Sequence, residues 1–196
     1  SIGELVLSAR SESKAVETAG SALQDYTDTY KAALWKCTID DRALEMSEQV
    51  TDQLDSLQGK LETYTGNLKK GVGLVRGVIR AVPTLIGVFT GDTNSREEAL
   101  SSTVDLAGGW LTGAFDEVSG VNEIKSLHKK FLADFDDQIE DAKCFHDAEM
   151  HLIGADTQAR RVEKAKLDLS RALLKIRNAK AEVARLIKEG RYRAGA

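Results

Sequence analysis

The stretch that decides the fold is residues 71–115. It begins with GVGLVRGVIRAVPTLIGVFTG at 71–91, passes a polar turn at 92–95 and returns with ALSSTVDLAGGWLTGAF at 99–115. The first arm holds eleven apolar side chains and five glycines among its 21 residues, and its charges are Arg76 and Arg80. Two apolar arms around a polar turn predict a helical hairpin. We call residues 71–116 the central segment.

The composition predicts an all-α protein. The chain has 196 residues with one proline, 6% aromatic, 30% charged and 42% hydrophobic residues. So few prolines favour long helices, and this apolar content excludes a wholly disordered chain. The length suits one domain spanning 1–196, in which 1–70 and 117–196 supply bundle helices and 71–116 the apolar hairpin.

The flanks of the central segment carry apolar residues at helical spacing of three and four. The pattern predicts helices over about 2–36, 41–70, 121–145 and 157–188. It predicts a turn at 154–157 and, at 69–71, either a helix end or the edge of the apolar hairpin. It leaves open whether the first two are one continuous helix. Four segments of similar length predict an elongated antiparallel four-helix bundle with a central hydrophobic, Gly-rich helical hairpin.

The two cysteines are placed symmetrically around the expected hairpin tip. Cys37 and Cys144 lie equally far along the chain from residues 90 and 91, so an antiparallel fold would bring them to the same height. We expect a disulfide, which would indicate an oxidising compartment. The alternative is two unpaired, buried cysteines in a cytosolic bundle.

The net charge of −4 hides an asymmetry. Residues 156–196 hold twelve Lys and Arg against five acids, whereas 131–150 hold seven acids and one Lys. We expect the basic helix to lie along the acidic stretch, because opposite charges favour neighbouring helix edges. Nucleic acid is therefore not an expected partner.

Catalytic and metal-binding patterns are weak. His146 and His151 are five residues apart, so on a helix they point about 140° away from each other, which does not suit a shared metal ion. The glycines at 71–73 precede no phosphate-binding Lys-Ser pair, and no Gly-x-Ser-x-Gly motif occurs. We expect a non-enzymatic protein without a cofactor or metal.

The central segment is the candidate functional part. Its glycine density is unfavourable in a water-exposed helix and typical of helices that pack within a bilayer. Arg76 and Arg80 share one helix face, opposite apolar side chains, and Pro83 and these arginines argue against an ordinary membrane span. We expect an amphipathic hairpin that is stored in a soluble form and released onto a membrane. The expected membrane-contacting residues are Val72, Leu74, Val75, Val78, Ile79, Val82, Leu85, Ile86, Val88, Phe89, Leu106, Trp110, Leu111 and Phe115.

A heptad-patterned helix, the two apolar arms quoted above around a turn, and a second heptad-patterned helix form a layout that resembles the α-helical pore-forming toxins of the cytolysin-A and haemolysin-BL type. The resemblance implies a secreted soluble monomer, insertion of the hairpin into a lipid membrane, and assembly into a homo-oligomer. No signal peptide is visible at Ser1, so the sequence would be a mature secreted chain. The alternative function is a structural or protein-binding bundle whose apolar hairpin completes a core or docks a partner.

Overall fold

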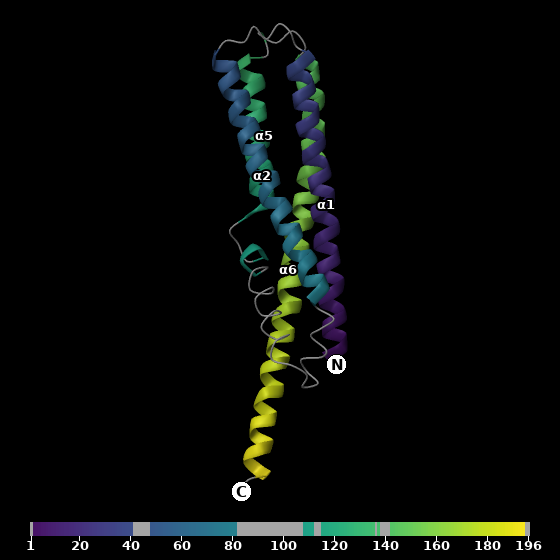
Figure 1. Ribbon diagram of the computed structural model, residues 1–196. Coiled ribbons are helices and arrows are strands. Elements are labelled where there is room, and N and C mark those ends of the chain that lie inside the picture. Colours follow the sequence, from purple (N-terminus) through teal and green to yellow (C-terminus); the bar gives the residue numbers. More distant parts are fainter. Residues whose placement is uncertain are drawn as a thin grey trace. The chain divides into compact units, whose positions relative to one another are not determined.

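The protein is an all-α helical bundle, as the composition predicts (Figure 1). A computed structural model describes residues 2–40, 48–81, 108–111, 115–135, 137 and 142–194. Its long helices are α1 (Ile2–Asp40), α2 (Glu48–Ala81), α5 (Glu117–Phe135) and α6 (Ala142–Ala194). The described residues contain no strand, and α1 packs against α2 and α5.

The chain divides into two compact units. Unit 1 comprises Ser1–Glu17, Gly73–Ala114 and Lys164–Ala196, and unit 2 comprises Thr18–Val72 and Phe115–Glu163. Helices α1, α2 and α6 therefore contribute residues to both units. The central segment belongs mostly to unit 1.

The core of unit 2 is built from apolar positions spaced three and four residues apart on four helices. On α2 the expected positions are buried at 4% exposure or less; they are Val50, Leu54, Leu57, Leu61, Tyr64 and Leu68. Other fully buried side chains include Leu23 and Tyr30 of α1, Ile124 and Phe131 of α5, and Phe145 and Leu152 of α6. Each large side chain contributes roughly 1.5–3 kcal/mol through removal of apolar surface from water, which makes these four faces the main source of cohesion.

On α1 the spacing of three and four also predicts a stripe of core-facing residues, and its members Ala9, Val16, Ala19, Leu23 and Tyr30 are buried. The same spacing places Tyr26 and Ala33 in the stripe, but there the buried residues are the next ones along the chain, Thr27 and Leu34, and Tyr26 is 39% exposed. The Thr27 hydroxyl donates a 3.1 Å hydrogen bond to the carbonyl oxygen of Leu23. Because this bond satisfies its polar group, a threonine can occupy a buried position.

Two predicted helix ends are wrong. Helix α2 continues without a break through Gly71 to Ala81, and α6 continues through Gly154. A Cβ atom at Gly154 would collide with the Tyr26 ring, so this glycine allows a close side-chain approach and does not end a helix.

The predicted helix over 121–145 is instead two helices, because α5 ends at Phe135 and α6 begins at Ala142. Asp136, Asp137, Glu140 and Asp141 lie in the sequence between them. Carboxylates are disfavoured at a helix C-terminus and favoured at an N-terminus, which accounts for a boundary in this stretch. As a consequence, Asp147 and Glu149 share α6 with the basic residues from 156 onward, so the expected antiparallel pairing is wrong for this part of the acidic stretch 131–150.

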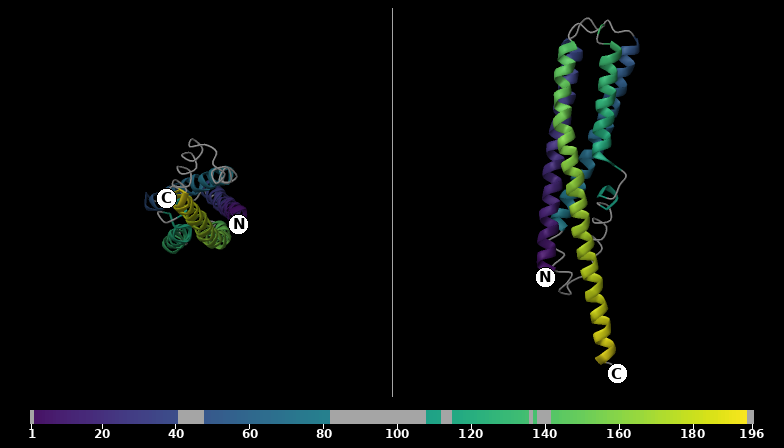
Figure 2. Two further views of the ribbon diagram at one scale, coloured as in Figure 1. Left: turned by 90° about the horizontal axis from the view of Figure 1, so that it is seen from below. Right: turned by 180° about the vertical axis from the view of Figure 1, so that it is seen from behind.

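In unit 1, one cluster of buried residues joins α1 and α6. Ala9 of α1 packs with Ala172 and Ile176 of α6, and the partly buried Leu5 and Leu173 lie against this cluster. Within this unit the two helices lie side by side, as both views of Figure 2 show. The small side chains of Ala9 and Ala172 let the two helices approach closely at this contact.

Candidate functional site

The first part of the central segment forms the last turns of α2. In unit 1, Val75 and Val78 are fully buried, while Arg76 and Arg80 are exposed. The Nε atom of Arg76 donates a hydrogen bond to Oε1 of Glu17 on α1 at 2.6 Å. The segment therefore turns its apolar face inward and meets α1 through an ion pair at the surface, where such a pair adds about 0–1 kcal/mol.

In unit 2, α1 and α2 approach closely next to the start of the central segment. A Cβ atom built at Gly20 would lie 2.6 Å from a methyl carbon of Val72. Both residues are buried. Glycine is thus the residue that allows Val72 to pack directly on the α1 backbone.

The return arm is described at residues 108–111, which are helical. Trp110 is 8% exposed, and its ring lies under the ammonium nitrogen of Lys166 on α6, at 4.7 Å from the ring centroid. Lys166 itself is only 3% exposed. The indole Nε1 is buried and has no hydrogen-bond partner among the described residues. A cation–π contact between two largely desolvated groups contributes up to about 2 kcal/mol, so it helps to hold residues 108–111 on α6.

The expected membrane-contacting residues fall into three groups. Those that are buried are Val72, Val75, Val78, Trp110 and Leu111. Those that are half-buried are Leu74, Ile79 and Phe115. Those that lie outside the described residues are Val82, Leu85, Ile86, Val88, Phe89 and Leu106. The described part of the segment is thus sheltered by the protein's own helices.

In unit 2, Tyr64 of α2 is the main contact at the end of the central segment. Its ring packs on Phe115 with the centroids 5.3 Å apart, and its hydroxyl donates a 3.2 Å hydrogen bond to the carbonyl oxygen of Glu117. A Cβ atom at Gly120 would collide with the same ring, so this glycine of α5 makes room for Tyr64. Burial first, and then the charges of Glu117 and Glu163, raise the pKa of Tyr64, which keeps the hydroxyl protonated as a donor.

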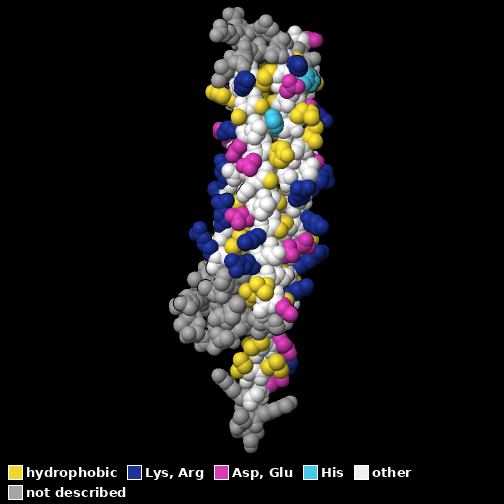
Figure 3. All heavy atoms as spheres, turned by 90° about the vertical axis from the view of Figure 1, so that its right-hand side faces the viewer, with side chains coloured by type: hydrophobic (Ala, Val, Ile, Leu, Met, Phe, Trp, Pro, Cys, Tyr) yellow, Lys and Arg dark blue, Asp and Glu magenta, His cyan; other side chains and the backbone are white. Residues whose placement is uncertain are grey.

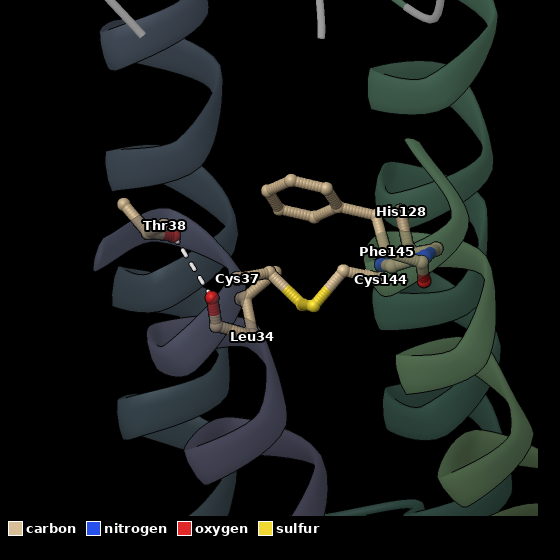
Figure 4. The surroundings of a disulfide bond; sticks show 6 residues. All are labelled: Leu34, Cys37, Thr38, His128, Cys144 and Phe145. Carbon is tan, nitrogen blue, oxygen red and sulfur yellow. Dashed lines mark hydrogen bonds between the residues drawn. A yellow bond between two sulfur atoms is a disulfide. The ribbon is translucent and has the colours of Figure 1, made fainter. Parts of the chain in front are cut away.

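The predicted disulfide between Cys37 and Cys144 is confirmed (Figure 4). It joins α1 to α6 within unit 2, with the Cα atoms 5.7 Å apart and 107 residues between the two cysteines. Cys37 is 2% exposed. A buried disulfide is compatible with an extracellular protein.

A buried polar chain lies beside the disulfide in unit 2. The Nε2 atom of His128 lies 3.0 Å from the carbonyl oxygen of Phe145, and Nδ1 lies 2.8 Å from the Tyr30 hydroxyl. Because a carbonyl only accepts, Nε2 carries a proton, and in the neutral imidazole, which burial favours, Nδ1 accepts a hydrogen bond from the Tyr30 hydroxyl. Burial lowers the pKa of His128, and burial followed by the charge of Glu149 raises the pKa of Tyr30.

Sequence reasoning missed Lys166, Glu17 and His128. Lys166 and His128 occupy core-facing positions: Lys166 is buried beside Ala165, which is also buried, and His128 is buried where the hydrophobic spacing favours its half-buried neighbour Leu127. A charged or titratable residue at core spacing is the one signal that could have found them. Glu17 has no such signal, since its partner Arg76 is 59 residues away.

Metal-ligand geometry is absent from the described residues, in which no cluster of three or more His, Cys, Asp or Glu side chains could hold an ion. His146 is exposed and His151 is half-buried on α6.

Figure 3 shows Lys and Arg side chains along much of one face of the molecule, interspersed with acidic ones.

Among the helices in the described ranges, none is long and apolar enough to cross a membrane. No protein family, no curated protein and no solved structure matches this chain.

Proposed function

We propose that the protein is a secreted helical bundle that interacts with membranes by releasing its central segment onto lipid, as a non-enzymatic pore-forming protein. The disulfide and the Tyr30–His128 hydrogen bond lie in unit 2, whereas residues 73–114 belong to unit 1. Within unit 1, the segment's links to the rest of the protein include the Arg76–Glu17 ion pair and the Trp110–Lys166 contact, neither of which is covalent.

This division of contacts is the observation that carries the proposal. Regions of one protein open with different free energies, and a part held by non-covalent contacts can open while a part that a disulfide cross-links stays folded. An apolar, glycine-rich segment can therefore leave the bundle while unit 2 stays folded. Homo-oligomers on the membrane would follow release, because the vacated helix faces would be apolar.

The second candidate is a structural or protein-binding bundle in which the segment is permanent core. It is favoured by the complete burial of Val75 and Val78, which continue the spacing of Leu68 and Val72 along α2. If the segment is permanent core, Trp110 does not contact lipid. The environment of this one side chain therefore distinguishes the two functions.

The two tryptophans provide the experiment. Trp35 of α1 is 58% exposed and Trp110 is 8% exposed. Trp35→Phe leaves Trp110 as the sole fluorophore, and Trp110→Phe is the matched control that leaves Trp35. Each variant is mixed with vesicles whose acyl chains carry bromine, which quenches tryptophan on contact.

We expect quenching of Trp110 and not of Trp35, together with release of a dye trapped in the vesicles. Sedimented protein with an unquenched Trp110 would show surface binding without release of the segment. Absence of both quenching and dye release over the range of lipids tested would favour the permanent-core function.

A further inference from the structure

The last described part of α6 has an exposed amphipathic surface. Leu186 and Ile187 are each 53% exposed, and in 177–190 only Ala179 and Val183 reach even half-burial. Figure 3 shows hydrophobic side chains at the surface of this lower end of α6. Leu186 and Ile187 are adjacent in the sequence, and an apolar surface that several residues of one helix form together is a candidate binding surface.

These apolar residues share one face. At about 100° per residue, Ala179, Val183, Leu186 and Ile187 fall within an arc of roughly 100°. We call these four residues the α6 stripe. Two other exposed leucines of α6, Leu167 and Leu174, point roughly 150–170° away from its centre, so they are not part of it.

The charges around the stripe are arranged unequally. Lys175 and Lys180 flank it, each about 70° from its centre. The acids of residues 175–190, Glu182 and Glu189, both bind Arg185: Glu182 Oε1 lies 2.6 Å from Arg185 Nη2, and Glu189 pairs with Nη1. The charges outside this triad are all basic; they are Lys175, Arg177, Lys180 and Lys188.

The charges beside the α6 stripe distinguish between possible binding partners. A second copy of the chain would bring basic flanks of the same sign together, which opposes pairing. Anionic lipid complements both features, because lysines beside an apolar stripe extend to the headgroups while the stripe enters the boundary of the acyl chains. Basic residues near such a surface each strengthen binding.

We infer that residues 175–190 of α6 bind the surface of an anionic lipid membrane, with the α6 stripe facing the acyl chains and Lys175 and Lys180 facing the headgroups. This inference rests on the proposed membrane function and adds a second contact that is independent of the central segment. It also assigns the lipid class, since the flanking charge is positive.

The test compares sedimentation of the whole protein with vesicles of phosphatidylcholine alone and of phosphatidylcholine with phosphatidylserine. The variant is Leu186→Ser with Ile187→Ser. The matched control is Leu167→Ser with Leu174→Ser, which removes two equally exposed leucines from the same helix outside the stripe. All four positions are exposed, so helix content by circular dichroism should stay unchanged.

We expect wild type and control to bind the phosphatidylserine vesicles alike, and the stripe variant to bind about tenfold more weakly. Lys175→Gln with Lys180→Gln should weaken binding to phosphatidylserine vesicles and leave the weaker binding to phosphatidylcholine unchanged. Equal losses in the stripe variant and its control would overturn the inference. So would a wild type that forms dimers without vesicles and loses them in the stripe variant, because the occupant would then be a second copy.

Fluorescence separates this inference from the proposed function. Stripe-dependent sedimentation with an unquenched Trp110 would support the α6 surface and contradict release of the central segment. Quenching of Trp110 with unchanged sedimentation of the stripe variant would support release of the central segment and contradict the α6 surface. A wild type that binds neither kind of vesicle would contradict both.

Discussion

The ammonium nitrogen of Lys166 lies 4.7 Å from the centre of the Trp110 ring, and both side chains are more than nine-tenths buried. This contact joins the return arm of the central segment to α6 within unit 1. It places a charge where an ordinary helix interface would have an aliphatic side chain. The strength of this one contact should therefore influence how readily residues 108–111 leave α6.

Replacing Lys166 with methionine should loosen the return arm. Methionine keeps most of the volume but removes the cation–π contact, at a cost of about 0.5–2 kcal/mol. In a Trp35→Phe background, we expect stronger acrylamide quenching of Trp110 and a shift of its emission to longer wavelength, without any membrane. Lys164→Met, at an exposed position two residues away, is the control and should change neither. Identical spectra for both variants would show that Lys166 does not hold Trp110.

Removing the disulfide should destabilise the fold. Cys37→Ala with Cys144→Ala opens a loop of 107 residues, which in the chain-entropy account is worth up to about 4.7 kcal/mol. The expected result is a lower midpoint of urea unfolding with a retained helical spectrum. Wild type with a reductant should show the same midpoint, and a midpoint that neither treatment lowers would contradict a stabilising role.

The sequence was sufficient for the parts of the fold where hydrophobic residues repeat regularly. On α2, every described position expected to face the core is buried, because leucines spaced three and four apart leave one choice of face. On α1 the small and hydroxyl-bearing residues leave two choices for the helix face that is buried. Thr27 occupies the core because its hydroxyl bonds to Leu23, which periodicity of hydrophobic residues cannot reveal.

The polar contacts of the candidate site could not be predicted for a related reason. His128 and Tyr30 are 98 residues apart, and each is acceptable in the core only because the other is there. Likewise, Gly120 and Gly154 resemble helix breaks in the sequence, but the aromatic rings that require them come from other helices. Such pairings depend on the tertiary structure and leave no local pattern.

His128 should make stability depend on pH. Burial lowers its pKa in the folded state below the usual 6.5; the hydrogen bond to the Phe145 carbonyl and the charge of Glu149 oppose this shift, and the charge of His146 supports it. Between these two pKa values the unfolded chain binds one more proton, so the stabilisation is present above about pH 6.5 and is lost as the pH falls, by up to about 1.4 kcal/mol per pH unit.

Urea unfolding at a series of pH values measures this effect. His128→Gln should be less stable near neutral pH and should lose the decline between neutral pH and the range in which carboxylates titrate. His146→Gln, at an exposed position of α6, is the matched control and should keep the decline. Parallel curves for wild type and His128→Gln would show that another group is responsible.

Two glycines of unit 2 should respond to alanine in opposite directions. At Gly59 of α2 an added Cβ meets nothing within 4 Å, so Gly59→Ala should stabilise the protein by about 0.5–1 kcal/mol through helix propensity. At Gly20 of α1 the new methyl would lie 2.6 Å from Val72, whose branched side chain is buried and has little freedom to move. Overpacking costs about 1–3 kcal/mol, which exceeds the propensity gain, so Gly20→Ala should destabilise. Urea unfolding of both variants decides between the outcomes: stabilisation by Gly20→Ala would mean that α1 and α2 are less tightly packed at the start of the central segment.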